Sequence, residues 1–356
     1  MTTSASHTRK NAVAPPADDQ LALFPMLESE SPPGETLSPL AKACEPTFGA
    51  HKEQPPLLNW LYKAYIALAE DPAVFAAKDA PIVFGVGKSQ VQALRFWMQA
   101  FKLALGEVTP GAPQRLLLTD RAHWLLHDLG ADPFLEEDGT LWLLHYWMLS
   151  TPCLVPTWWT VLQHPLSRTS RRDLTENTMR QAREAGWKPS ESAVRRDVDC
   201  LVRMYAREAS RQRDSIEDDL LRVFTRLPIL QLDQDIHQVR LPRGPRFSLP
   251  PAILAYICLD YAHHIDPRPG ALSIHRLTRE PGSPGSVLRM WSDDLERALE
   301  TDVHDDLCIM DSIGGDVLAF RRPPLQLAWE ILDSHYNGVR ERLGMRLDLA
   351  DETRTG

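Results

Sequence analysis

Hydrophobic residues recur at helical spacing through much of the chain, which predicts a mainly helical fold. In residues 89–105, Val91, Leu94 and Met98 fall on one face of the predicted helix. Basic and polar side chains occupy the opposite face, so one face packs while the other stays exposed. The exposed residues of interest are Lys88, Ser89, Gln92 and Arg95.

This helix is one of a series of elements. Residues 60–70 are predicted as a helix, residues 81–87 as a short turn or strand, and residues 108–119 as a hairpin. Helix, turn, helix and hairpin is the order of a winged helix, which places one helix against DNA. We therefore predict that the four exposed residues bind DNA.

The pattern recurs in the middle of the chain. Residues 171–185 are predicted as a helix that Gly186 ends, and Ser190 begins another helix with Val194 and Val198 on its apolar face. This second helix-turn-helix is the more basic of the two. Its predicted DNA-binding residues are Ser190, Ser192, Arg195 and Arg196.

A third unit follows, with predicted helices at 249–264, 272–280 and 295–301, a hairpin at 307–321 and a closing helix at 325–343. The predicted fold class is therefore mainly α with small β hairpins, built from tandem winged-helix or helix-turn-helix modules after a disordered N-terminal tail. The predicted units are the tail at 1–43, a winged-helix-like domain at 44–130, a helical linker with the second helix-turn-helix at 131–215, and a third winged-helix-like domain at 216–356.

The charge distribution changes the interpretation of the net charge of -9, which by itself argues against nucleic acid. Residues 168–213 contain twelve Lys and Arg against seven Asp and Glu. A basic middle between acidic segments fits local contact with double-stranded DNA. A solvated helical face accounts for the same charges equally well.

The expected location is the cytoplasm. The longest apolar stretches, such as residues 141–149, are too short for a membrane span, and no secretory signal is recognisable. The five cysteines are scattered singly, which favours a reducing compartment and argues against a zinc site.

Nucleotide binding is not expected either. Gly85-Val86-Gly87-Lys88-Ser89 looks like the end of a phosphate-binding loop, but the full motif needs glycine where Ile82 stands. The N-terminus of the following helix could still hold a DNA phosphate. His123 and His127 lie four residues apart with no third ligand in view, so structural roles are favoured for both.

Candidates for chemistry are few. His51 and Glu53 are the best local pair for proton transfer or metal-assisted hydrolysis, with Mg²⁺ or Mn²⁺ as the expected ion and unknown metal ligands. No spaced pair of carboxylates with a following lysine, as in many nucleases, stands out. The enzyme prediction is therefore a metal-dependent nicking endonuclease acting through His51 and Glu53.

The predicted tail contains one apolar island, Gln20-Leu21-Ala22-Leu23-Phe24. It resembles the peptide by which many bacterial proteins dock on the DNA polymerase sliding clamp. Leu23 and Phe24 could fill an apolar pocket while Gln20 hydrogen-bonds its rim and Leu21 packs beside them. The alternative is that the island folds back onto the protein's own surface.

From Phe48 to about Phe320 the chain resembles a bacterial family known as domain of unknown function four thousand and seven. The family lies in DNA phosphorothioation and phage-defence operons and includes SspB-type nicking components. The matching segments are Phe48-Gly49-Ala50-His51, Trp60-Leu61, Asp79-Ala80-Pro81, Gly85-Val86-Gly87-Lys88, Arg95-Phe96-Trp97, Leu141-Trp142-Leu143-Leu144-His145, Gly186-Trp187-Lys188-Pro189-Ser190-Glu191-Ser192, Arg196-Asp197-Val198 and Pro281-Gly282-Ser283-Pro284-Gly285.

The resemblance implies a protein that nicks one DNA strand so that sulfur can replace a phosphate oxygen. Its implied partners are a cysteine desulfurase, an ATPase and a sulfur transferase. The chain departs from the family's Gly-His-x-Thr-Phe segment with a downstream arginine, because His51-Lys52-Glu53-Gln54 and Leu57 stand there. Two alternatives remain, a non-enzymatic scaffold that binds DNA and recruits modification partners, and a transcriptional regulator.

Overall fold

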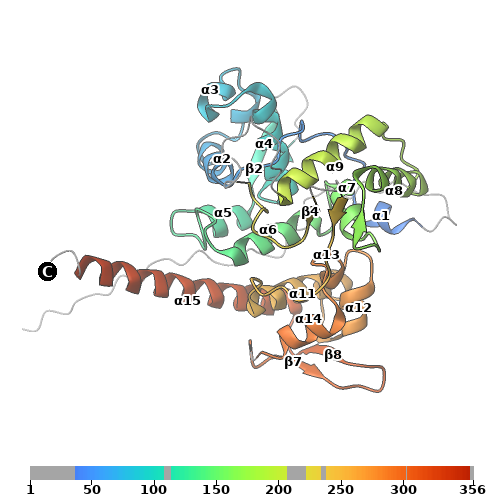
Figure 1. The fold of residues 1–356 in the computed structure, drawn as a ribbon. Helices are drawn as coiled ribbons and strands as arrows, with labels where there is room; N and C mark the ends of the chain where they lie inside the picture. The colour runs from blue at the N-terminus through green and yellow to red at the C-terminus, as the bar shows by residue number, and fades with distance from the viewer. Residues whose placement is uncertain (1–36, 108–113, 207–221, 234–237, 302, 353–356) are drawn as a thin grey trace, which may run out of the picture.

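The computed structural model describes residues 37–107, 114–206, 222–233, 238–301 and 303–352, with the side chains of 340–352 outside the description. Within these ranges the chain is about half helical and carries small antiparallel sheets (Figure 1). The prediction of a mainly helical fold with small hairpins is confirmed. Most of the predicted tail lies outside the described residues. None of the described helices is long and apolar enough to cross a membrane.

The N-terminal part contains the first predicted module. Residues 81–87 were expected as a turn or strand, and this prediction is wrong. Pro81 occupies the first turn of a helix there, which Gly85 ends in a left-handed conformation with φ 63°. The elements are α1 (Pro39–Ala43), α2 (Leu58–Glu70), the 3-10 helix η2 (Val74–Ala76), α3 (Ala80–Phe84), α4 (Lys88–Ala100), β1 (Ala104–Glu107) and β2 (Arg115–Leu118).

The helix α4 ends five residues earlier than the predicted 105, because Lys102 takes a left-handed backbone with φ 58° and Ala104 begins β1. β1 and β2 pair as an antiparallel hairpin, with Ala104 opposite Leu118. The tip of the predicted hairpin, residues 108–113, lies outside the described residues. The order of helices and hairpin follows the prediction, while the winged-helix assignment stays a prediction.

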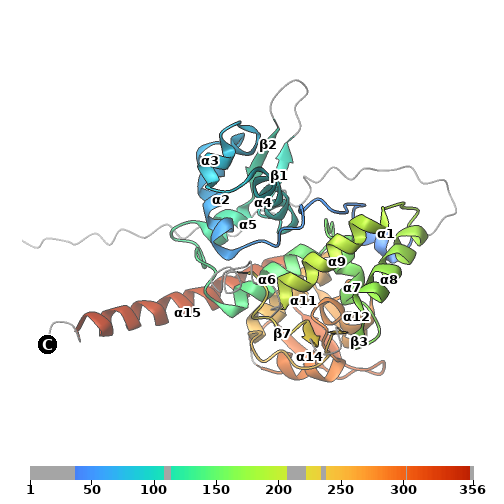
Figure 2. The same cartoon turned by 45° about the horizontal axis from the view of Figure 1, so that its top comes forward.

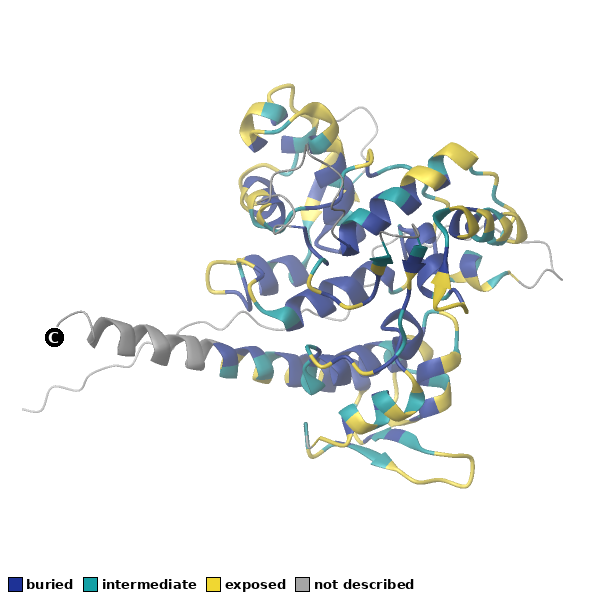
Figure 3. Cartoon of the chain, in the orientation of Figure 1, coloured by how far each residue is buried: buried dark blue, intermediate teal, exposed yellow. Residues whose placement is uncertain are grey.

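Apolar helices form the centre of the molecule (Figure 2). Every residue from Gly139 to Leu149 of α6 is buried, and α11 packs along α15, which continues past the body (Figure 1). The buried hydrophobic residues form one connected core from Leu40 to Tyr336 (Figure 3). The helices here are α5 (Asp120–Leu126), α6 (Asp138–Leu149), α11 (Pro251–Ile265) and α15 (Pro324–Glu352).

Two units with the same topology lie on this core. In each, a helix is followed by a strand, by two described helices in the first unit and three in the second, and by two further strands. The last strand lies in the middle of a three-stranded antiparallel sheet. The first unit is α7 (Pro156–Leu162), β3 (Arg168–Thr169), α8 (Arg171–Glu184), α9 (Glu191–Tyr205), β4 (Gln231–Asp233) and β5 (Gln238–Arg240). The second is α11, β6 (Gly270–Ser273), α12 (Ile274–Arg279), α13 (Pro284–Val287), α14 (Ser292–Leu299), β7 (Leu307–Met310) and β8 (Val317–Phe320).

Sequence patterns found most of these elements. The helices at 171–185 and 249–264 and the hairpin at 307–321 are confirmed within a few residues. The segment at 272–280 is a helix only from Ile274, because Gly270–Ser273 pairs with β8 instead. The closing helix runs to Glu352 rather than to 343. The predicted boundary between 215 and 216 falls in residues outside the description.

Candidate nucleic-acid interface

Capping residues and a glycine determine where the two helices of the first unit begin and where α8 ends. The Ser170 hydroxyl accepts from the Asp173 amide, and the Asp173 carboxylate accepts from the Ser170 amide, so α8 begins with a capping box. Gly186 follows the helix with φ 77°, a conformation that favours glycine. The Ser190 hydroxyl then accepts from the Ala193 amide at 3.2 Å and caps α9.

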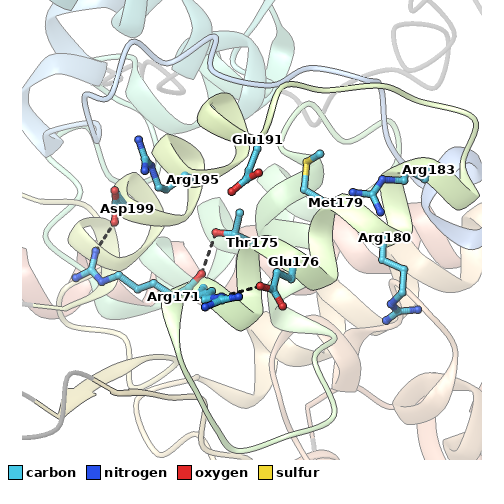
Figure 4. Close-up of a pocket in the computed structure, with 10 residues that line it drawn as sticks. Arg171, Thr175, Glu176, Met179, Arg180, Arg183, Glu191, Arg195 and Asp199 are labelled. Carbon is cyan, nitrogen blue, oxygen red and sulfur yellow. Dashed lines mark hydrogen bonds and ion pairs between the residues drawn. The ribbon is translucent and has the colours of Figure 1, made fainter.

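Side chains of both helices line a groove of about 820 Å³ between α8 and α9 (Figure 4). The helices pack through buried apolar residues such as Leu174, Val194 and Val198, which leaves their polar faces to the groove. Five of the ten lining residues are arginines and three are acidic. The lining residues are Arg171, Arg172, Thr175, Glu176, Met179, Arg180, Arg183, Glu191, Arg195 and Asp199.

Three groove arginines are paired with carboxylates. Arg171 meets Asp199 at 2.7 Å, and this pair joins α8 to α9. Two others are paired within α8, Arg172 with Glu176 at 2.7 Å and Arg180 with Glu184 at 3.1 Å. Such exposed pairs are weak, about 0–1 kcal/mol each, so a phosphate can replace the carboxylate.

The remaining two arginines are exposed and differ from these three. Within the described part of the chain, no carboxylate forms an ion pair with Arg183 or Arg195. Arg183 lies in the last turn of α8 and Arg195 in the second turn of α9. The groove therefore presents two arginines without an ion-pair partner among the described residues, one from each helix, together with the exposed carboxylate of Glu191.

The structure brings some of the predicted DNA-binding residues of α9 together. Arg195 lines the groove, and the exposed Ser190 and Ser192 lie at the helix N-terminus with their hydroxyls 3.2 Å apart. Arg196 lies outside the groove lining, with its Nε 3.4 Å from the Glu53 carboxylate. Free amides, hydroxyls and a nearby guanidinium make the start of α9 suited to an anion.

The predicted residues of α4 form a separate surface. Lys88, Ser89 and Gln92 are exposed, whereas Arg95 is half-buried, and burial lowers the pKa of its guanidinium below the ordinary value. Gln90 caps the helix through a bond from the Gly87 amide to its side chain at 2.8 Å. These residues line none of the groove between α8 and α9.

His51 is buried, with a side chain only 2% exposed. Its Nε2 lies 2.7 Å from Oδ1 of Asp197 on α9, and its Nδ1 accepts from the Glu53 amide at 3.1 Å. The ring stacks on Trp97 at 5.9 Å and meets the edge of Trp158 at 5.4 Å. Both ring nitrogens are thus engaged, and His51 attaches the segment before α2 to α9.

Two opposing influences set the charge of this ring. Burial disfavours the imidazolium, while Cys200 and Asp197 favour it and raise the pKa of His51 above its ordinary value. The Glu53 amide, which points at Nδ1, opposes protonation of that nitrogen. A role for His51 in proton transfer would require these contacts to open.

Glu53 is exposed and lies beside α9. Its carboxylate meets Arg196, and its backbone carbonyl accepts from Arg203 at 2.6 Å. Both Lys52 and Glu53 have left-handed backbones, with φ of 50° and 62°. Such conformations cost non-glycine residues about 1–3 kcal/mol each and often mark functional segments.

Among the described side chains, no group of three or more His, Cys, Asp or Glu could hold a metal ion. Two carboxylates, Glu296 and Asp316, do meet by a hydrogen bond that raises the pKa of Glu296 to about 7. Mg²⁺ often uses one or two carboxylates with water, but this acidic pair alone does not make a site.

The groove residues of α8 were not predicted from the sequence. The helix pattern assigned DNA contact to the second helix of the pair, whereas Arg172, Arg180 and Arg183 of the first helix also line the groove. Their spacing of three to eight residues along one helix was the available signal. The pattern also missed Asp197, whose contact with His51 joins positions 146 residues apart.

Comparison with known proteins shows the family to which this chain is related. A family model described as protein of unknown function (DUF4007) matches residues 48–336. The chain belongs to the DUF4007 family. This confirms the predicted family, and no curated protein sequence matches the chain significantly.

Two solved structures related to this DUF4007 member resemble it over most of their length. One is described as the SspB crystal structure, with 38% identity, a TM-score of 0.79, and coverage of 85% of this chain and 92% of the other. The second is a magnesium ion-bound SspB crystal structure, with 37% identity, a TM-score of 0.79, and coverage of 85% and 91%. The fold and the family are therefore shared with SspB.

Proposed function

We propose that this chain is the DNA-binding component of a bacterial DNA phosphorothioation system with an anti-phage role. The likeness to SspB supports the system, and the groove between α8 and α9 supports the DNA contact. The observation that carries the proposal is the pair of exposed arginines, Arg183 and Arg195, one on each wall of this groove, in a lining of five arginines and three acidic residues.

Duplex DNA fits this arrangement for a physical reason. Its phosphates carry closely spaced negative charge, and arginine forms bidentate, charge-assisted bonds with phosphate oxygens. The start of α9 adds the Ser190 and Ser192 hydroxyls and the free amides of a helix N-terminus. We place phosphate contacts along the groove and at this helix end.

The binding test compares the Arg183→Ala/Arg195→Ala protein with wild type on blunt duplex DNA. Removing two phosphate contacts should weaken binding at every sequence and lower the slope of log affinity against log salt by about two. A control, Arg268→Ala/Arg297→Ala, changes the charge equally but removes arginines outside the groove that meet carboxylates at 2.7 and 3.7 Å. Equal slopes for wild type and the groove variant would refute the groove assignment.

Strand nicking is the further part of the proposal. We propose that the chain opens one strand with Mg²⁺ or Mn²⁺, supported by the magnesium-bound SspB relative and by the left-handed backbone at Lys52 and Glu53. A supercoiled-plasmid assay would compare wild type with His51→Gln and Glu53→Gln. If the Glu53→Gln protein loses nicking but stays folded and still binds DNA, Glu53 takes part in the chemistry.

The alternative function, a non-enzymatic DNA-binding scaffold, predicts a different result in the same assay. The buried, fully engaged His51 favours an architectural role for this residue. If purified protein binds DNA but never nicks it with either metal, the chain is a scaffold that recruits the modification enzymes. A transcriptional regulator would instead protect one defined operator sequence.

Partner recruitment completes the proposal. We propose that Gln20, Leu21, Leu23 and Phe24, which lie outside the described residues, bind the sliding clamp, and that the cysteine desulfurase, ATPase and sulfur transferase act alongside. Deleting residues 1–25 should abolish co-elution with the clamp and leave DNA affinity intact. A deleted protein that still co-elutes would contradict the tail proposal, and Leu23→Ala/Phe24→Ala provides the matched point variant.

A further inference from the structure

An exposed aromatic surface lies where the two topologically alike units meet. Phe247 is 95% exposed and Trp291 is 48% exposed. The guanidinium carbon of Arg243 lies 5.1 Å from the centroid of the Trp291 ring, within the range of a cation–π contact. We refer to Arg243, Phe247 and Trp291 as the Trp291 surface.

In the segment before α11, buried and exposed residues alternate, and this alternation points Phe247 outward. Gly244 and Arg246 are buried, whereas Arg243 is half-buried and Phe247 exposed. The Gly244 amide donates to the Arg289 carbonyl at 3.1 Å, which fixes this segment against the turn that precedes Trp291. Exposure of Phe247 is therefore set by a well-anchored backbone.

Two buried arginines, Arg246 and Arg289, lie beneath the Trp291 surface. Arg246 donates to the carbonyls of Leu288, Pro228, Pro242 and Arg289 at 2.8–3.1 Å. Arg289 donates to the carbonyls of Leu162, His164 and Leu241 at 2.6–3.1 Å. Carbonyls satisfy the N–H groups but do not cancel the charge, so both guanidinium groups keep positive potential under the surface.

Other charges near this surface are mainly positive. Arg279 is exposed and close enough to Arg243 to lower the pKa of that guanidinium, after the larger effect of burial. The carboxylate of Asp294 acts on Arg246 beneath the surface, and it also lies 3.7 Å from Arg297. Arg243, Arg246, Arg279 and Arg289 therefore give this surface an excess of positive charge.

Two exposed arginines lie on the strands that lead toward the groove and toward the segment of Arg243. Arg168 of β3 lies opposite Arg240 of β5 in register, and both are exposed. β3 leads through Ser170 into α8, while β5 leads through Leu241 into the segment that carries Arg243. Along the chain, these arginines therefore lie between the helices of the groove and the segment that carries Arg243.

We infer that the Trp291 surface binds unpaired nucleotides of a DNA strand whose duplex part lies in the groove. Every base has a π-face, so bases stack on exposed aromatic rings without regard to sequence, while arginines hold the backbone. An apolar protein partner would not need the cluster of uncompensated arginines. The inference rests on the proposed DNA-binding function and adds its substrate class, a junction of duplex and single strand.

The test uses a single-stranded oligonucleotide that contains 2-aminopurine, whose fluorescence changes when the base stacks. Wild type should quench it, and Phe247→Ala/Trp291→Ala should lose the quenching and bind the strand about tenfold or more weakly, as loss of stacking predicts. Blunt duplex affinity should stay within about twofold, since phosphate contacts in the groove dominate it. Trp291→Phe, with Phe247 intact, should keep most of the quenching.

Fold integrity is not at risk in these variants. Phe247 is almost fully exposed, and Trp291 makes no side-chain capping bond to α14. Ile313→Ala/Met310→Ala removes two exposed apolar side chains elsewhere in the second unit and is the matched control. Unchanged quenching in the aromatic variant would overturn the inference.

Failure of the two proposals can be told apart. Loss of duplex binding in Arg183→Ala/Arg195→Ala with retained quenching supports both the groove and the separate Trp291 surface. Wild-type protein that binds neither form of DNA refutes the proposed function itself. Protein that binds duplex but does not quench the single strand refutes only the inference about unpaired nucleotides.

Discussion

The unit that contains α9 and the unit that contains α14 share one topology but carry different side chains. Their sheets have the orders β3-β5-β4 and β6-β8-β7, and each unit places helices before its last two strands, α8 and α9 in the first and α12, α13 and α14 in the second. In the first unit the helix pair forms a groove with five arginines. In the second, carboxylates gather around α14.

Those carboxylates change the pKa of one of their number, Glu296. The hydrogen bond that the protonated Glu296 carboxyl donates to Asp316, burial, and repulsion by Asp316, Glu300 and Asp293 together raise the pKa of Glu296 to about 7. A surface that disfavours its own negative charge also disfavours phosphate. The comparison teaches that the repeated topology does not determine the proposed DNA-binding site, which depends on the side chains placed upon it.

The largest expected effect concerns how α9 is held. The buried Asp197 carboxylate accepts from the Gly49 amide, the Thr157 hydroxyl and Nε2–H of His51 at 2.7–2.9 Å. Asp197→Ala leaves these donors unpaired and should cost about 3–5 kcal/mol in denaturant unfolding. Asp199→Ala, two residues away and partly exposed, should cost under about 1 kcal/mol. Similar losses would show that α9 does not depend on Asp197.

The next effect tests the link between the two units. Nδ1 of His145 accepts from the Tyr205 hydroxyl of α9 at 2.7 Å, and its Nε2–H donates to the Val287 carbonyl of α13 at 3.0 Å. Burial lowers the pKa of His145 from 6.5 to about 4. The folded state therefore resists protonation that the unfolded state accepts, and stability should fall as pH drops from 6.5 to 4.

The expected loss in this window is about 3 kcal/mol. Unfolding free energies measured across the window should show it, and His145→Gln should flatten the dependence by up to one proton. Gln keeps a donor and an acceptor, so the variant isolates titration from the loss of hydrogen bonding. An identical pH slope in the variant would contradict the assignment.

A smaller effect compares equivalent charge reversals in the two units. Arg195→Glu should weaken binding to blunt duplex by about tenfold, because it removes one phosphate contact and adds repulsion. Arg297→Glu on α14 reverses a similarly exposed arginine and should change the affinity by less than about twofold. Filter binding at two salt concentrations would measure both. Equal effects would mean that net charge, rather than the groove, controls binding.

The smallest effect concerns Glu296. With a pKa raised from 4.5 to about 7, this carboxyl favours folding at low pH, and that contribution is lost as pH rises through 7. Glu296→Gln should therefore raise the melting temperature by about 1–3 °C at pH 8 and leave it unchanged at pH 5. Destabilisation at pH 8 would show that Glu296 is held by a favourable contact instead.

Local signals explain what the sequence could predict. The bounds of α8 and the start of α9 follow from caps and glycine within a few residues of each helix end, so they were predicted almost to the residue. The left-handed Lys102 gives no such signal, which is why α4 was extended too far. β6 was missed because its pairing with β8 joins residues about fifty positions apart.

The candidate site was predictable only in part, for the same physical reason. Arg195 could be assigned from the helix pattern, but the groove needs the packing angle of α8, which brings Arg183 onto the opposite wall. His51 was predicted from its residue type as a catalytic group, and sequence could not reveal that Asp197 and Trp97 enclose it. The Trp291 surface depends on contacts between segments distant in the chain.

The most direct test of the central claim is amide hydrogen exchange with and without blunt duplex DNA. The account predicts slower exchange in residues 171–205, which form α8 and α9, and no change in residues 292–299 of α14. Because the two units share their topology, each serves as the control for the other. Protection of α14 with none in α8 and α9 would contradict the account.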